Sequence, residues 1–172
     1  MAYVKEPPSK QLYDLRDFLK RIGFADTTFS RFDYAQAVLD VLEKNDQKIE
    51  VLRYTVPGIK DLPVGCKILF GKGCDIVIAC GMVGRMPIDK QCSHEASLGL
   101  QAVQLSEGKH ILEVFVHMDE AGSDAELAGI CKDRARKHAE NALMLLFDQK
   151  RLRERAGTGR RQGRADEGPL KI

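Results

Sequence analysis

The sequence predicts an α/β fold, a three-layer sandwich in which helices cover both faces of a four-stranded parallel sheet. Short apolar runs alternate along the chain with longer segments of helical periodicity, and this alternation is typical of βα units. The run from Asp75 to Cys80 is continuously apolar after its first residue, as expected of a strand that helices cover on both faces. Right-handed crossovers join parallel strands of this kind and complete the three layers.

The individual elements follow from the apolar positions and from the residues that break regular structure. We expect strands at residues 21–25, 49–55, 75–80 and 111–117, and helices from about residue 30, over 62–72, from about 90 to 105, and from 124 to about 147. The 90–105 helix is expected to bury Ala96, Leu98, Leu100, Val103 and Leu105. The segment Gly81–Asp89 is longer than a usual βα loop, which suggests a functional role.

At 172 residues the chain has room for one domain with one core, which we place at residues 20–150. Residues 1–19 are predicted to form an N-terminal arm, in which Ser9 can cap a short amphipathic helix. Residues 151–172 are predicted to form a basic C-terminal tail. We expect the Arg- and Gly-rich stretch from Asp148 onward to be mobile.

Composition argues against several classes of protein. The formal net charge of +2, with 6% aromatic residues and no Trp, gives little support for nucleic-acid binding. No run approaches the roughly 18 apolar residues of a membrane span, and the first ten residues lack the apolar core of a secretory signal. The five cysteines contain no CxxC pair, which favours reduced thiols over a disulfide framework or a zinc site. We therefore expect a cytoplasmic protein with no nucleic-acid or membrane partner.

Most polar residues of interest follow the predicted strands. In an open α/β sheet, ligands bind outside the carboxyl ends of the strands. The segments at those ends are residues 26–29, 55–61, 81–94 and 115–117. This clustering predicts a binding site at the carboxyl edge of the sheet.

Five motifs in these segments and in the last helix resemble the archaeal riboflavin synthases. They are Asp26-Thr-Thr-Phe, Thr55-Val-Pro-Gly-Ile-Lys-Asp-Leu-Pro, His94-Glu-Ala-Ser-Leu-Gly-Leu, Glu113-Val-Phe-Val-His, and Arg134 followed by His138-Ala-Glu-Asn. Their order and spacing agree over nearly all of residues 22–168, whereas residues 1–19 lie outside the resemblance. A fainter similarity extends to lumazine synthase. The resemblance implies a lumazine-synthase-like fold with flavodoxin-like winding.

The resemblance also implies a transferase that needs no cofactor and acts on 6,7-dimethyl-8-ribityllumazine. One molecule donates a four-carbon unit to a second, which gives riboflavin and a ribitylamino-pyrimidinedione. The substrate carries its own electrophile and its own acidic methyl group, so the protein has to supply proximity, orientation and proton transfer. A homopentamer with active sites between subunits is implied as well. The sequence shows no defined metal-ligand set and leaves open whether Mg²⁺ assists through the substrate oxygens.

The candidate catalytic residues are His94, Glu95 and Asp61. We expect His94 near the start of a helix, after Asp89 and Ser93 as candidate caps, where the helix dipole favours a neutral imidazole. Each of these residues also has an ordinary structural explanation. Asp61 suits the first turn of a helix, and Glu95 could simply face water.

The candidate substrate-binding residues come from all four strand ends. The turn at residues 58–61 offers exposed backbone groups and two charged side chains to a polyol such as the ribityl chain. Phe29 can stack on a heterocycle, although it could also belong to the core, and His117 can reach a neighbouring pocket in the family arrangement. The full set is Thr28, Phe29, Gly58, Ile59, Lys60, Asp61, Met82, Val83, His94, Phe115 and His117.

Three alternatives remain open from the sequence. Lumazine synthase needs an anion nest for a phosphorylated substrate, whereas the segment after Gly81 has Arg85 and Lys90 but no hydroxyl residue before Ser93. A flavin carrier would bind riboflavin in the same pocket without turnover. An assembly protein would use the arm and the tail to build a larger shell. The tail motif Gly159-Arg-Arg-Gln-Gly also resembles the family, so it can fold across a neighbouring active site.

Overall fold

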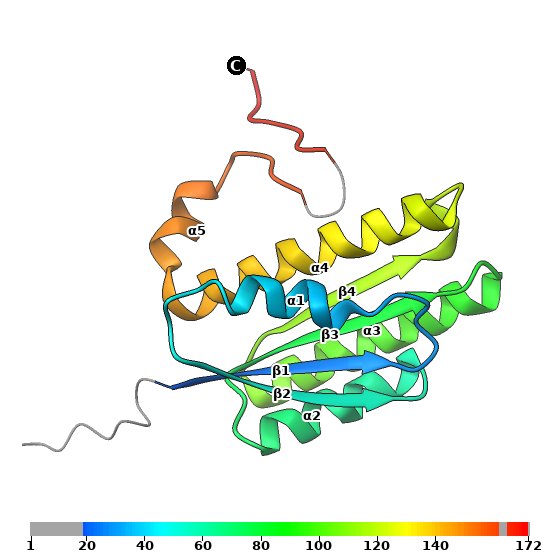
Figure 1. Cartoon of the computed structure of the whole chain (residues 1–172), viewed down its shortest axis with the longest axis horizontal. Coiled ribbons are helices and arrows are strands. Elements are labelled where there is room, and N and C mark those ends of the chain that lie inside the picture. Colours follow the sequence, from blue (N-terminus) through cyan, green and yellow to red (C-terminus); the bar gives the residue numbers. More distant parts are fainter. Residues whose placement is uncertain (1–18, 162–164, 172) are drawn as a thin grey trace, which may run out of the picture.

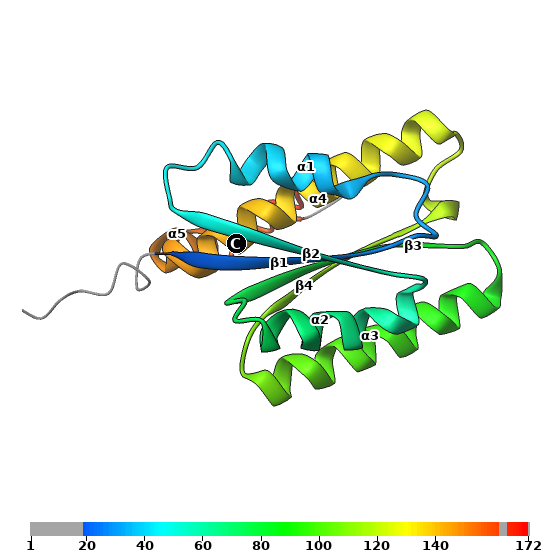
Figure 2. The same cartoon turned by 60° about the horizontal axis from the view of Figure 1, so that its bottom comes forward.

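A computed structural model describes residues 19–161 and 165–171 of the chain. The four strands are β1 (Lys20–Thr27), β2 (Ile49–Val56), β3 (Ile76–Val83) and β4 (Ile111–His117). They form one parallel sheet in the order β2-β1-β3-β4 (Figure 1). Helices α1 (Tyr34–Leu42) and α4 (Asp124–Phe147) cover one face, and α2 (Leu62–Gly71) and α3 (Pro87–Glu107) cover the other (Figure 2). The predicted three-layer α/β sandwich is confirmed.

The centre of the fold is β3, whose eight residues are all buried. Its side chains alternate between a core under α1 and α4 and a core under α2 and α3. At Gly81 a Cβ atom would lie 2.7 Å from Ile59 Cγ2 and 3.1 Å from Phe115 Cε1. The glycine therefore lets the turn after β2 and the end of β4 pack closely against β3, which brings three strand ends together.

β3 continues three residues beyond its predicted end and reaches Val83. A glycine inside a strand often marks a break, yet β3 continues through Gly81 because residues 81–83 pair with Phe115–His117 of β4. The prediction of a long loop at Gly81–Asp89 is therefore wrong, since only residues 84–86 separate β3 from α3. The functional role inferred from its length loses its basis.

The helix that follows starts earlier than predicted, at Pro87 instead of Lys90. Proline suits the first helical position because that residue needs no backbone donor there. The Asp89 carboxylate accepts a hydrogen bond from the Met86 N–H at 2.9 Å and so stabilises this helix start.

Conversely, α1 starts later than predicted, at Tyr34 instead of near Ser30. The Asp33 carboxylate caps it by accepting a hydrogen bond from the Ala35 N–H at 3.0 Å. Residues 28–33 are therefore a loop between β1 and α1.

Only part of the predicted inner face of α3 is buried. Ala96 and Leu100 are buried against the sheet, and Val103 packs at the edge of the same core. Leu98 and Leu105 are instead 52% and 85% exposed. Leu98 lies two residues from both Ala96 and Leu100, which points it away from the sheet. The predicted burial of these two leucines is wrong.

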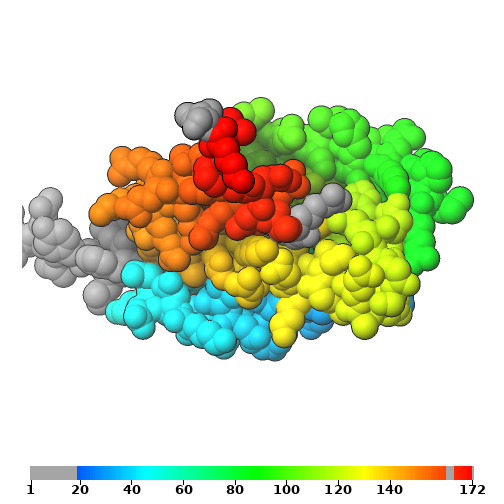
Figure 3. All heavy atoms as spheres, turned by 90° about the horizontal axis from the view of Figure 1, so that it is seen from above, coloured from blue at the N-terminus to red at the C-terminus, as the bar shows by residue number. Residues whose placement is uncertain are grey.

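The C-terminal region contains more regular structure than predicted. Helix α5 (Gln149–Arg155) follows α4 directly, and the Asp148 carboxylate caps it by accepting a hydrogen bond from the Arg151 N–H at 3.0 Å. The chain then turns back beside α4 (Figure 3), and the Glu167 N–H donates to the Gly159 carbonyl at 2.9 Å. The mobile tail expected from Asp148 onward is thus helical in its first part.

The predicted N-terminal arm lies outside the described residues, apart from Leu19. The same holds for the helix that Ser9 is predicted to cap.

Candidate active site

The strand order places a divergence point at the carboxyl edge of the sheet. β1 and β3 are neighbours, but the chain leaves β1 toward α1 on one face and β3 toward α3 on the other (Figure 2). Ligands of open α/β sheets bind at such a point. The loops at residues 28–33 and 84–86 border it, and the turn after β2 lies beside it.

The β1–α1 loop carries an aromatic ring into solvent, since Phe29 is 53% exposed. Its neighbour Thr28 donates its backbone N–H to the Val56 carbonyl at 2.9 Å and its hydroxyl to the Pro57 carbonyl at 3.1 Å. These bonds fasten the loop to the end of β2. Phe29 is therefore an exposed ring on a fixed backbone, a surface on which a flat heterocycle can stack.

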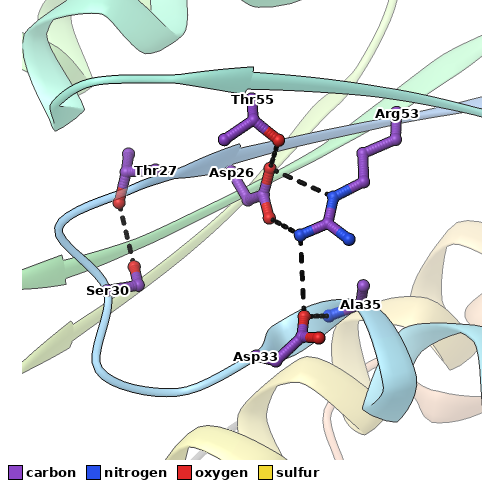
Figure 4. A network of polar contacts seen from close by, with 7 residues as sticks. All are labelled: Asp26, Thr27, Ser30, Asp33, Ala35, Arg53 and Thr55. Atoms are coloured by element: carbon purple, nitrogen blue, oxygen red, sulfur yellow. Dashed lines mark hydrogen bonds and ion pairs between the residues drawn. The ribbon is translucent and has the colours of Figure 1, made fainter.

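A buried carboxylate lies just before this loop, at Asp26 on β1. It accepts hydrogen bonds from the Thr55 hydroxyl at 2.6 Å and from Arg53 Nη2 at 2.5 Å (Figure 4). Sequence reasoning named Asp26 and Thr55 at strand ends but missed Arg53. Its spacing from Thr55 could have indicated it, because residues two apart in a strand point to the same face of the sheet.

The turn after β2 is tied to α3 by an ion pair. Residues Ile59–Asp61 form a single 3₁₀ turn, η2, which Gly58 precedes. Lys60 Nζ lies 2.6 Å from Glu95 Oε2, and Gln91 donates to the other Glu95 oxygen at 3.0 Å. The hydrogen bond from Lys60, followed by that from Gln91, lowers the pKa of Glu95. Glu95, which follows His94 in the chain, is therefore ionised at neutral pH and holds Lys60.

His94 is exposed on α3, but not at the helix start as predicted. It is the eighth residue of the helix, and the field of a helix end falls off within about one turn. Ser93 is no cap, because it is buried inside the helix and donates its hydroxyl to the Lys90 carbonyl at 3.2 Å. The dipole argument for a neutral imidazole is therefore wrong, although the ring is accessible because His94 is exposed.

The end of β4 is fixed by a bidentate ion pair. Arg134 of α4 donates to both carboxylate oxygens of Glu120, at 3.0 and 2.6 Å, and to the Phe115 carbonyl at 2.6 Å. Glu120 in turn accepts a hydrogen bond from the His117 N–H at 2.8 Å. Burial acts to raise the pKa of Glu120, but the bonds from Arg134 and His117 lower it overall. His117 thus stands at a rigid strand end.

Comparison with known proteins decides the family. A family model described as 6,7-dimethyl-8-ribityllumazine synthase matches residues 20–150. The chain is 50% identical over 151 residues to the riboflavin synthase of Methanothermobacter thermautotrophicus, covering 87% of this chain and 99% of the relative. It is 47% identical to that of Archaeoglobus fulgidus over 151 residues, with 87% and 98% covered, and 46% identical to that of Aeropyrum pernix over 153 residues, with 88% and 99% covered.

The chain belongs to the archaeal riboflavin synthase family. The resemblance inferred from the five motifs is thereby confirmed.

The structure brings most of the candidate site residues of this riboflavin synthase family member to one edge of the sheet. Around the carboxyl ends lie Thr28 and Phe29 in a loop, the 58–61 turn, His94 with Glu95 in α3, and His117 as the last residue of β4. Met82, Val83 and Phe115 are buried, so their side chains belong to the cores. Direct contact of these three residues with a substrate stays a prediction.

Glu113 on β4 is a partly buried carboxylate to which sequence reasoning gave no role. It accepts a hydrogen bond from the Ser97 hydroxyl of α3 at 2.9 Å, and burial raises its pKa. A carboxyl group whose pKa is raised in the folded state lowers the free energy of unfolding once it has to ionise. This loss is absent below the pKa of the unfolded state, about 4.3, and it is complete when the pH has risen through the pKa of the folded state.

We therefore expect Glu113→Gln to raise the melting temperature at pH 7–8, by about 1–3 °C on the usual scale for a chain of this size, and to leave it unchanged near pH 4. Thermal unfolding followed by circular dichroism across this range checks the expectation. A variant that is less stable than the parent at pH 8 would contradict it.

Among the described residues, no three or more His, Cys, Asp or Glu side chains are grouped so that they could hold a metal ion. In the same part of the chain, no helix is long and apolar enough to cross a membrane. Hollows of about 450 and 610 Å³ border α4 and α5, away from the carboxyl edge, and their lining contains none of the candidate site residues. We place the site at the strand ends because the polar and aromatic groups converge there.

Proposed function

We propose that the protein is a riboflavin synthase that converts two molecules of 6,7-dimethyl-8-ribityllumazine into riboflavin and 5-amino-6-ribitylamino-pyrimidinedione, the last step of riboflavin biosynthesis. The observation that carries this proposal is 46–50% identity to riboflavin synthases over nearly their whole length. The two products together contain all atoms of the two substrates, so the reaction needs no oxidant and no redox cofactor. Binding, orientation and proton transfer are what the chain has to supply.

The candidate residues divide this work among them. Phe29 stacks on one heterocycle, and the backbone of the 58–61 turn, with Lys60, binds a ribityl chain through its hydroxyls. His94 takes the proton from the acidic methyl group of one lumazine and returns it during bond cleavage. Glu95 is assigned to hold Lys60, and Asp61 stays a further candidate for proton transfer. His117 completes the pocket of a neighbouring subunit.

Exposed leucines on α3 support an oligomer. Leu98 and Leu105 are seven residues apart, so they share one face of the helix, and Ile88 is exposed on the same helix. Apolar residues gathered in this way mark protein–protein contacts. We propose a homopentamer with its active sites between subunits.

Replacing both leucines by aspartate is expected to dissociate the assembly, because two charges would be buried without partners in each contact. Light scattering after size-exclusion chromatography measures the mass. Leu170→Asp serves as a matched control, since this leucine is 89% exposed near the C-terminus. An unchanged mass of the double variant would exclude α3 as the contact.

The C-terminal segment is proposed to reach a neighbouring active site. Among the described residues after Gly157, Gly159 and Asp166 border a hollow beside α4, and the Glu167 N–H donates to the Gly159 carbonyl. Deleting the residues after Gly157 is expected to lower riboflavin formation several-fold without changing the oligomeric mass, because α3 stays intact. Unchanged kinetics of the truncated protein would overturn this role.

The loop between β3 and α3 disfavours lumazine synthase activity. That activity requires an anion-binding site, but Ser93 is buried in α3 and Lys90 is paired with Asp119, so neither is available for it. Arg85 alone remains in the short loop. In parallel assays, lumazine alone should give riboflavin, whereas the pyrimidinedione with a phosphorylated four-carbon sugar should give no lumazine. Formation of lumazine would reverse the assignment.

The same assays decide the remaining alternatives. Riboflavin that binds without any turnover of lumazine would indicate a carrier. Assays in EDTA and in Mg²⁺ determine whether a divalent ion assists through substrate oxygens; we propose that no cofactor is required.

The free cysteines, four of them buried, support a cytoplasmic location.

A further inference from the structure

Arg53 connects three elements behind the substrate-facing loop (Figure 4). Its guanidinium carbon lies 5.6 Å from the centre of the Phe24 ring on β1. Nη2 lies 2.5 Å from an oxygen of Asp26, and Nε lies 3.4 Å from the other oxygen. Nη2 also lies 3.7 Å from the carboxylate of Asp33, which caps α1. One side chain from β2 thus joins the end of β1 to the start of α1.

The partner of Arg53 has little freedom to move. The Asp26 side chain is only 8% exposed, and it receives a third hydrogen bond from the Thr55 hydroxyl at 2.6 Å. An ionised carboxylate that is buried without such partners is strongly disfavoured. The position of Asp26 therefore fixes the guanidinium, and the guanidinium is in place to hold Asp33.

The loop between these anchors is the one that presents Phe29. At its first end, the Thr27 and Ser30 hydroxyls lie 2.9 Å apart and the Thr28 N–H bonds to β2. At its second end, Asp33 accepts a hydrogen bond from the Ala35 N–H and forms a longer ion pair with Arg53, whose side chain is 49% exposed. Phe29 lies between the two ends with an exposed ring.

We propose that the Asp26–Arg53–Asp33 bridge is a positioning device for substrate binding. It holds the loop at residues 28–33 so that Phe29 is already oriented for stacking when lumazine arrives. Arg53 then acts through Phe29 and not on the reacting atoms, so the bridge governs substrate affinity more than proton transfer. This inference rests on the proposed riboflavin synthase function.

Arg53→Met keeps an unbranched apolar stem and removes the guanidinium with its charge. We expect KM for lumazine to rise about 10-fold while kcat changes less than about 3-fold, because the loop has to be ordered at the cost of binding free energy. The KM of Arg53→Lys should lie between those of the parent protein and Arg53→Met, because lysine keeps the charge but lacks the planar guanidinium. Arg21→Met is the matched control. Arg21 pairs with Glu50 at 2.7 Å across the same two strands at their amino ends, so its loss should leave KM unchanged.

A double-mutant cycle with Phe29→Ala separates positioning from general destabilisation. If Arg53 acts through the ring, Arg53→Met should raise KM less than about 2-fold in the Phe29→Ala background. Equal effects of Arg53→Met with and without the ring would overturn the proposal. Should Arg53→Met fail to fold, the cycle is run with Arg53→Lys.

Hydrogen exchange of the substrate-free protein tests the loop independently of activity. Arg53→Met should speed exchange in a peptide that spans residues 27–35 and leave β3 and β4 protected. Unchanged exchange in that peptide would also overturn the proposal. An absence of lumazine turnover by the parent protein would instead refute the proposed function, and the exchange result would still decide whether Arg53 orders the loop.

Discussion

We expect that replacing His94 by glutamine lowers kcat for riboflavin formation by about 100-fold or more, the usual contribution of a positioned proton-transfer group. Glutamine keeps a polar side chain of similar reach but cannot exchange a proton near neutral pH. KM should change little, because the stacking ring of Phe29 and the 58–61 turn remain. Steady-state kinetics with 6,7-dimethyl-8-ribityllumazine measure both constants.

His110→Gln is the control for this experiment. His110 is also exposed, but it precedes β4 at the opposite edge of the sheet from the site. The control should retain full activity. A His94→Gln variant whose kcat stays within about 3-fold of the parent would remove His94 from the proton-transfer role and make Asp61 the next candidate.

We expect that replacing Arg134 by methionine destabilises the fold by about 3 kcal/mol, the lower end of the cost of removing one partner of a buried ion pair, because this pair is partly buried. The Arg134 and Glu120 side chains are only 13% and 19% exposed, so solvent screens their pairing weakly. The variant leaves Glu120 without its bidentate donor, and the Phe115 carbonyl loses a hydrogen bond. Chemical denaturation at pH 7 measures the loss.

The pH dependence of this effect has a definite sign. The pKa of Glu120 is lowered in the folded state. Its contribution is therefore complete above the unfolded value of about 4.3 and is lost as pH falls through the folded value. The stability difference between the parent and Arg134→Met should accordingly shrink in acid.

A control lies on the same helix. Arg136 of α4 pairs with Glu140 and Asp133, but its side chain is 45% exposed. Exposed pairs contribute roughly 0.2–1 kcal/mol, so Arg136→Met should be nearly neutral. Equal losses in the two variants would contradict the assignment of Arg134 as the anchor of the β4 end.

The local sequence pattern predicted the bounds of those elements in which tertiary packing follows the local preference. The bounds of β4 and α4 match the prediction, because apolar residues fill the strand and Ser123 caps the helix. Errors arose where packing overrides local preference. Gly81 is part of β3 because residues 81–83 pair with β4, and no local pattern reveals a partner that comes from another strand.

The sequence placed the candidate site no more finely than the carboxyl edge of the sheet. The rule that ligands bind at strand ends predicts from the sequence alone that Phe29, the 58–61 turn and His117 lie at one edge of the sheet. Arg53 was not predicted because a charged residue inside a strand looks like a solvated position. Only the tertiary structure brings its partners Asp26 and Asp33 next to it.

The most direct test of the proposed function is to incubate the purified protein with 6,7-dimethyl-8-ribityllumazine as the sole substrate and to quantify every product by chromatography. We predict that two lumazine molecules disappear for each riboflavin formed and that the pyrimidinedione appears in an amount equal to the riboflavin. Lumazine that remains unconverted, or riboflavin without an equal amount of pyrimidinedione, would contradict the proposed reaction.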